Sequence, residues 1–170
     1  FWNDSEKSTP IITKLKRLQN KLASYNKLLE DLTNLKELNE LLLLDNDEDL
    51  GKQLLTSSVD IQNKIEKLEL ETLLSGKYDK NNAIITLHPG AGGTESQDWA
   101  QMLYRMYTRW ASNNGFTVKE LDFLEGDEAG IKSVTFEIVG ENAYGYMKSE
   151  MGVHRLVRIS PFDAGGRRHT

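Results

Sequence analysis

The chain has 170 residues, of which 38% are hydrophobic and 28% charged, and its formal net charge is −5. These proportions are typical of a globular protein with one medium or two small domains, and the acidic balance argues against a protein that coats nucleic acid non-specifically. The absence of cysteine excludes disulfides and thiolate metal sites and fits a reducing compartment. The longest apolar run, Leu41 to Leu44, is too short to span a membrane.

The first half of the chain predicts two long helices. From Pro10, which suits the first turn of a helix, apolar residues recur in steps of four and three, as in the seam of a coiled coil. These positions are Ile11, Leu15, Leu18, Leu22, Tyr25, Leu29 and Leu32. After an acidic turn at residues 45–49, a second helix is predicted from about Lys52 to Gly76. Residues 1–80 therefore predict an antiparallel helical hairpin whose leucines pack together, an arm or docking module without chemistry of its own.

The composition changes after Lys80, and residues 81–170 predict an α+β domain with a mostly antiparallel sheet packed against helices. Strands are expected at residues 83–87, 116–124, 131–139 and 153–159, and helices after Thr94 and near residues 141–150. The alternation of apolar residues breaks between Val118 and Leu121, which predicts a β-bulge. Thr94 and Gln97 have the spacing of a capping box at the start of the first of these helices.

A glycine-rich loop, residues 90–94, lies between the first predicted strand and the helix that follows it. A nucleotide-binding enzyme is one interpretation of this pattern. However, a P-loop needs a lysine where this loop has Gly93, and Glu95 and Asp98 would repel a phosphate. Glycine backbone beside a carboxylate can instead contact the uncharged edge of a ligand such as a nucleic-acid base. A simple turn between strand and helix, without a ligand, explains the spacing of the glycines equally well.

The sequence contains few candidates for catalytic or metal-binding residues. The three histidines, His88, His154 and His169, are far apart in the sequence and lack metal-ligand partners at helical spacing. No serine or acid pair has the arrangement of a nucleophile or a glycosidase. We therefore expect no enzyme, no metal and no cofactor.

The last eleven residues, Ser160 to Thr170, combine cations, an aromatic ring, an imidazole and small hydroxyls, which are the groups that hold single-stranded RNA. Pro161 ends the strand predicted before them. Residues 151–170 contain four arginines and one acid, Asp163, so cationic charge is concentrated at this end. The chain stops within the loop, which predicts a fragment, truncated at its C-terminus.

Several stretches together resemble the bacterial class-I peptide chain release factors over nearly the whole chain. They are Gly90 to Ala100, Glu128 to Val134, Ala143 to Tyr146, Gly152 to Arg158 and Ser160 to Thr170. The tripeptide Ser160-Pro161-Phe162 is similar to that of the branch that ends translation at UAA and UGA, because the sister branch carries Pro-x-Thr there.

The resemblance implies a role for each matching residue of the site. Gly92 and Glu95 would read the first base, U, of the stop codon. Ser160 would face the second base, and its hydroxyl, as donor and acceptor, would tolerate either purine. His169 would stack on the second base, and Thr170, with Val157 alongside, would border the third. The remaining implied residues are Pro161 and Phe162, which would hold the shape of the loop, and Arg167 and Arg168, which would meet RNA phosphates.

The resemblance also implies the partners: the ribosome, through rRNA of the decoding centre and ribosomal proteins, and the mRNA stop codon, in the cytoplasm and without a membrane. The family's release motif, Gly-Gly-Gln, is missing, since Gly165-Gly166 is followed by Arg167. The expected fragment therefore reads UAA and UGA but lacks the part that triggers peptidyl-tRNA hydrolysis. The alternative is a ribosome- or protein-docking helical module without codon reading.

Overall fold

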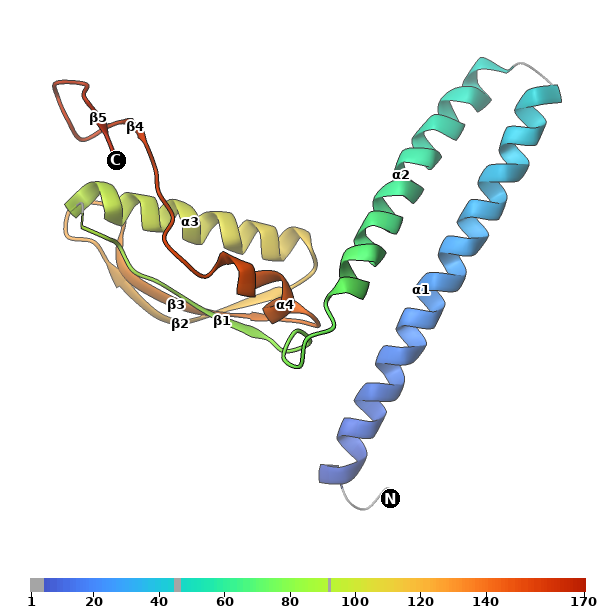
Figure 1. Ribbon diagram of the computed structural model, residues 1–170, viewed down its shortest axis with the longest axis horizontal. Helices are drawn as coiled ribbons and strands as arrows, with labels where there is room; N and C mark the ends of the chain where they lie inside the picture. Colours follow the sequence, from blue (N-terminus) through green and yellow to red (C-terminus); the bar gives the residue numbers. More distant parts are fainter. Residues whose placement is uncertain (1–4, 45–46, 92) are drawn as a thin grey trace. The chain divides into compact units, whose positions relative to one another are not determined.

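The computed structural model describes residues 5–44, 47–91 and 93–170, and the chain divides into two compact units, Phe1–Thr72 and Leu73–Thr170 (Figure 1). The first unit is helical and the second has a small antiparallel sheet, so the predicted α+β class is confirmed. Asp79 is buried in the second unit, where it accepts hydrogen bonds from the Gly76 N–H at 2.9 Å and Lys148 Nζ at 2.7 Å. The domain boundary at residue 80 remains a prediction.

Helices α1 (Ser5–Leu44) and α2 (Glu48–Leu73) form the antiparallel hairpin of the first unit. α2 begins earlier than the predicted Lys52 because the Asp47 carboxylate accepts the N–H groups of Asp49, at 2.8 Å, and Leu50, at 3.3 Å, which makes it an N-cap. α1 also begins earlier than predicted, so Pro10 lies in its second turn rather than its first. An ion pair of 3.0 Å between Lys64 Nζ and Asp31 Oδ2 joins the two helices.

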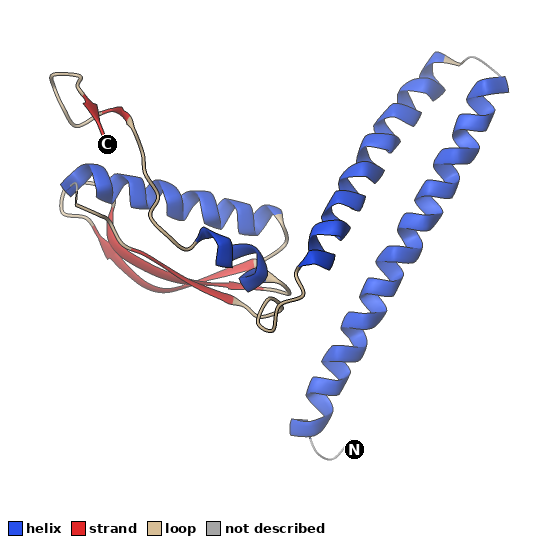
Figure 2. Ribbon diagram, viewed as in Figure 1, coloured by secondary structure: helices blue, strands red, loops and turns tan. Residues whose placement is uncertain are grey.

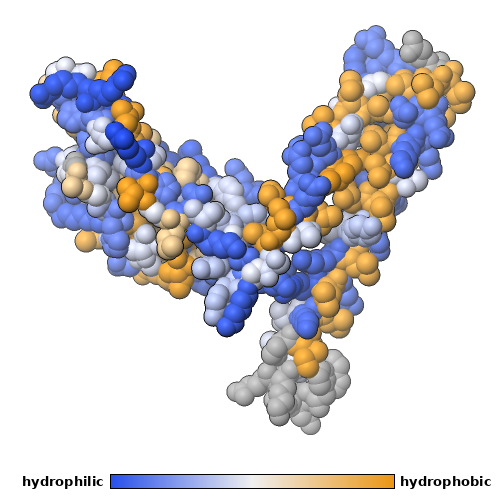
Figure 3. Space-filling model, viewed as in Figure 1, coloured by the Kyte–Doolittle hydropathy of each residue, from blue (hydrophilic) through white to orange (hydrophobic). Residues whose placement is uncertain are grey.

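The predicted seam of α1 is only partly covered. Leu28, Leu32, Leu35, Leu38 and Leu42 are half-buried in the hairpin, opposite residues that include the buried Ile61 of α2. The expectation that the earlier seam positions pack as core is wrong, because these side chains are 47% to 61% exposed: Ile11, Leu15, Leu18, Leu22, Tyr25 and Leu29. At about 1.5 Å per residue, the 40-residue α1 is longer than the 26-residue α2 and extends past its end. Figure 3 shows apolar side chains along the surface of this hairpin.

The second unit is built on a three-stranded antiparallel sheet in the order β1–β3–β2. Strands β1 (Ala83–Leu87) and β3 (Ile131–Val139) have the predicted bounds, and β2 (Thr117–Glu125) is shifted by one residue. The register of β2 on β3 slips between Glu120 and Asp122, so the predicted bulge near Leu121 is confirmed.

Helix α3 (Gly93–Asn113) covers one face of the sheet. From Val134 to Ile138 of β3, every second side chain is fully buried beneath α3, and Phe136 is the largest of these. The helix contributes Ala100, Leu103, Tyr107 and Ala111 to the same core. Because apolar residues alternate along β3 and recur at helical spacing along α3, the sequence specifies this packing directly. Among the described helices of the chain, none has the length and apolar character to cross a membrane.

After the sheet come helix α4 (Ala143–Met147), a 3₁₀ turn (Lys148–Glu150) and a long loop (Figure 2). The strand predicted at residues 153–159 is wrong, because only Arg158–Ile159 (β4) is a strand, and it pairs with Arg168–His169 (β5). Instead of joining the sheet, residues 153–157 run along α3, where the Trp99 Nε1–H donates to the His154 carbonyl at 2.9 Å. Val153 is 99% exposed, so its apolar side chain does not indicate a strand.

Candidate nucleic-acid interface

The N-terminal turn of α3 forms one half of the candidate interface. The Ser96 hydroxyl donates to the carbonyls of Gly90, at 3.0 Å, and Gly93, at 2.9 Å, and so fastens the glycine loop to the helix. The predicted capping box is wrong: the helix begins at Gly93, and the Thr94 hydroxyl donates to Glu128 Oε2 at 2.9 Å. Gly92, one of the predicted base-reading residues, lies outside the described residues.

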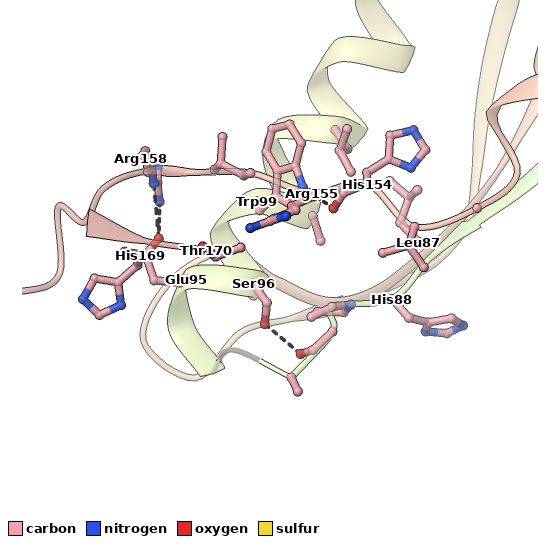
Figure 4. Close-up of a pocket in the computed structure, with 18 of the residues that line it drawn as sticks. Leu87, His88, Glu95, Ser96, Trp99, His154, Arg155, Arg158, His169 and Thr170 are labelled. Atoms are coloured by element: carbon pink, nitrogen blue, oxygen red, sulfur yellow. Dashed lines mark hydrogen bonds and ion pairs between the residues drawn. The ribbon is translucent and has the colours of Figure 1, made fainter. Parts of the chain in front are cut away.

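The loop of residues 160–170 forms the other half of the interface. Arg158, which lies just before this loop, binds to α3. The guanidinium of Arg158 donates to Glu95 Oε2, from Nη2 at 2.8 Å and Nε at 3.2 Å (Figure 4). It also donates from Nη2 to Asp98 Oδ2 at 2.6 Å. The pKa of Glu95 is lowered by the Ser160 hydroxyl and by this guanidinium. The same carboxylates raise the pKa of Arg158. Glu95 is therefore anionic and the guanidinium is cationic at neutral pH.

Ser160 is enclosed by the fold of the loop and is only 5% exposed. Its hydroxyl oxygen accepts the N–H of Phe162 at 3.1 Å, and its own N–H donates to the Arg167 carbonyl at 3.1 Å. Pro161 and Phe162 occupy the turn that follows, and both are exposed. A base can reach the Ser160 hydroxyl only if the loop opens locally.

Asp163 closes the loop from inside. Its carboxylate accepts hydrogen bonds from Arg167 Nε at 2.7 Å and the Gly165 N–H at 2.9 Å, and one oxygen lies 3.1 Å from His169 Nε2. These donors, Arg167 first, hold the pKa of Asp163 well below its usual range. The Arg167 side chain is exposed although it is ion-paired, so it still presents positive charge to solvent.

The structure brings together four of the predicted site residues. Glu95, His169 and Thr170 line a groove of about 430 Å³ between α3, the start of the glycine loop and the C-terminal segment, and Ser160 lies beside Glu95. Val157 and Arg168 are exposed and lie outside the lining of this groove. The roles of all these residues in reading bases stay predictions.

Sequence reasoning missed three residues that organise the site: Arg158, Asp98 and Asp163. Arg158 and Asp98 are 60 residues apart in the sequence, and no spacing rule joins an arginine to a carboxylate over that distance. Asp163 carried a signal, because it is the one acid among the arginines of residues 151–170. Such an acid is well placed to accept hydrogen bonds from the cations around it.

A polar cluster around the buried Tyr107 anchors the segment that leads into the loop. The Tyr107 hydroxyl donates to Glu150 Oε2 at 2.9 Å, and its oxygen lies 2.9 Å from His154 Nε2. His154 therefore acts as a structural hydrogen-bonding residue. Within the described part of the chain, no group of three His, Cys, Asp or Glu side chains could hold a metal ion.

The Tyr107 cluster gives the domain a pH-dependent stability. Burial, followed by the hydrogen bond to Glu150 and its charge, raises the pKa of Tyr107 to about 12. An unfolded tyrosine titrates near 10, so the stability from neutral Tyr107 is complete below about pH 10 and is lost as the pH rises to about 12. Tyr107→Phe should remove this dependence and cost about 0.5–1.5 kcal/mol at neutral pH, because the hydrogen bonds to Glu150 and His154 are lost while both of these side chains stay accessible to water.

The measurement is urea unfolding at a series of pH values, with Tyr78→Phe as the control because Tyr78 is exposed. If the free energy of unfolding changes with pH in the same way in the wild type and in Tyr107→Phe above pH 10, the prediction is wrong.

The sequence model of the PCRF domain matches residues 1–170, the whole chain, and the chain therefore belongs to the PCRF domain family. Among its curated relatives are Peptide chain release factor 2 of Aliarcobacter butzleri and of Wolinella succinogenes. Each is 52% identical over 170 residues, which are 100% of this chain and 47% and 46% of the relatives. The structure of RF2 of Thermus thermophilus has 44% identity and a TM-score of 0.59, over 99% of this chain and 47% of that one.

The comparisons confirm the resemblance to class-I release factors that the motifs indicated. The chain spans about half the length of the curated relatives it matches.

Proposed function

We propose that this chain is the codon-reading portion of a translation termination factor and recognises UAA and UGA in the ribosomal decoding centre. The observation that carries the proposal is the Arg158 bridge, which holds the loop of residues 160–170 beside the N-terminal turn of α3. The relatives named Peptide chain release factor 2 support it. The role is recognition rather than catalysis, and it needs no cofactor and no metal.

In this proposal the two halves of the interface read different bases. The backbone beside Gly92 and Glu95 contacts the first base, and Ser160, His169 and Thr170 contact the second and third. A serine hydroxyl can accept from the amino group of adenine or donate to O6 of guanine, which explains the acceptance of both purines. Because Ser160 is buried in the closed loop, codon binding must open the loop locally.

The partners are the ribosome and its mRNA in the cytoplasm. The exposed Arg167 and Arg168 contact phosphates of rRNA or mRNA, which position the loop without carrying sequence information. The exposed ring of Phe162 offers a stacking surface next to them. No Gly-Gly-Gln occurs in this sequence, so peptide release belongs to a further part of the full-length protein.

Peptide release by the full-length protein tests the codon assignment. Ribosomes that carry a peptidyl-tRNA and UAA, UGA or UAG in the A site are mixed with the protein, and the freed peptide is measured. We expect release on UAA and UGA and none on UAG. Release on UAG at a comparable rate would refute the assignment.

Ser160→Ala tests the reading of the second base. Loss of one hydrogen bond of ordinary strength should reduce the preference for UAA over UUA and UCA by about three- to tenfold, with a smaller change in affinity for ribosomes that carry UAA. Ser149→Ala is the control, because its hydroxyl donates to the Tyr146 carbonyl at 3.2 Å, away from the loop. An equal loss of binding on every codon would contradict the role of Ser160.

A second function is favoured by the exposed apolar positions of α1, which suit a helical arm that docks on a ribosomal or regulatory protein without codon reading. In that case binding to ribosomes would not depend on the codon in the A site.

A further inference from the structure

We propose that Arg158 is a positioning residue that sets the spacing between the two halves of the codon-reading site, an inference that rests on the proposed function. In this scheme Arg158 contacts none of the three bases of the codon. It acts through its ion pairs with Glu95 and Asp98 on α3 and through the β4–β5 strand pair that closes the loop.

The guanidinium of Arg158 contacts three side chains along one face of α3. Its Nη2 donates to Glu95 Oε2 at 2.8 Å and to Asp98 Oδ2 at 2.6 Å, and its Nη1 lies 3.6 Å from Met102 Sδ. The partners are spaced by three and four residues, which places them on the same side of a helix. A planar guanidinium holds two carboxylates in one geometry because its donors are fixed in a fork, whereas the donors of a lysine ammonium rotate.

The ion pairs are shielded from solvent. The side chains of Arg158, Glu95 and Asp98 are 23%, 18% and 23% exposed, in contrast to a fully solvated surface pair, which fixes little. Asp98 has no assigned role in base reading. The bridge therefore pairs a predicted reading residue, Glu95, with two residues that support it.

Arg158 is also directly connected to the reading loop. In the β4–β5 pair, Arg158 lies directly opposite His169, and Ser160 follows Arg158 by two residues. A displacement of Arg158 relative to α3 therefore moves both Ser160 and His169 relative to Glu95. Binding constellations must be held to within about 0.5 Å of the productive geometry, so a loose bridge should impair discrimination between codons before it abolishes binding.

The experiment measures dissociation constants of this chain for ribosomes that carry UAA, UGA, CAA or UGG in the A site. CAA differs from UAA at the first base and UGG differs from UGA at the third. Arg158→Gln should reduce both the CAA/UAA and the UGG/UGA ratios of the dissociation constants by at least about tenfold, as expected when hydrogen bonds to a charged group are lost. Arg158→Lys should restore only part of the discrimination, and Asp98→Asn should lose part of it.

Arg105→Gln is the matched control, because it removes the same charge from an exposed arginine of α3 that lies outside the lining of the groove. It should weaken binding on all four codons by one common factor and leave both ratios within about twofold. Unchanged ratios in Arg158→Gln, or a loss equal on every codon, would overturn the positioning role.

Hydrogen exchange in the free chain separates this inference from the proposed function. Arg158→Gln should speed the exchange of the Ser160 and Phe162 amides, which are hydrogen-bonded inside the loop, and leave the amides of β3 unchanged. If the amides of β3 also exchange faster, Arg158→Gln has destabilised the whole domain, and the measurement is repeated with Asp98→Asn. Unchanged loop exchange overturns the inference, whereas wild-type binding that is independent of the codon overturns the proposed function itself.

Discussion

Gly130→Ala is expected to destabilise the second unit by several kcal/mol, well above the loss from the same change at Gly115. Both glycines have a left-handed backbone, with φ of +73° at Gly130 and +77° at Gly115, which costs an alanine about 1–2 kcal/mol. At Gly130 a Cβ atom would also overlap the backbone of Gln97 and Asp98 in α3. Helix α3 must therefore move away from the loop that contains Gly130 and precedes β3 in the sequence.

At Gly115 no described heavy atom lies within 4 Å of the position that an alanine methyl group would occupy, so only the left-handed penalty applies there. Urea unfolding, followed by the fluorescence of Trp99 and Trp110 on α3, measures both variants. Equal losses in the two variants would show that α3 does not pack against Gly130. Since the displaced turn carries Glu95, Gly130→Ala should also weaken codon-dependent ribosome binding, and Gly115→Ala should not.

Phe136→Ala should cost about 3–5 kcal/mol, because Phe136 is fully buried between the sheet and α3. Its ring packs edge-on against Tyr104, with centroids 5.0 Å apart, and the cavity left by alanine cannot be filled without moving the helix. Phe162→Ala is the control, because that ring is 47% exposed and its loss should change stability by less than about 1 kcal/mol. Similar losses in both variants, measured by urea unfolding, would contradict the assignment of the core.

The sequence predicted the sheet well because its signals are local. Strand β1 is a continuous run of β-branched and apolar residues, and in β3 apolar residues alternate with polar ones. The predicted bounds of both strands are confirmed. The bulge near Leu121 was predicted for the same reason, since a break in alternation is visible along one strand.

The errors arise where tertiary contacts override local signals. The apolar residues 153–157 resemble a strand, but Trp99 binds the backbone at His154 and directs this segment along α3. The early seam of α1 has a coiled-coil pattern, yet α2 ends too soon to cover it. The capping pair at Thr94 has the right spacing, but Glu128 takes the hydroxyl.

The sequence proposed residues for the candidate site but not the connections between them. Glu95, Ser160, His169 and Thr170 were identified through motifs, and the structure places them around one groove and the loop beside it. The arrangement depends on Arg158 and Asp163, whose partners are determined by the fold. The burial of Ser160 is likewise a property of the closed loop, and no single residue in the sequence specifies it.

The central claim, that these residues read stop codons, is tested most directly by filter binding of this chain to ribosomes that carry UAA, UGA, UAG or a sense codon in the A site. We expect tight binding on UAA and UGA and weaker binding on UAG and the sense codon. Equal binding on all four would contradict the claim and would favour a docking module that does not read the codon.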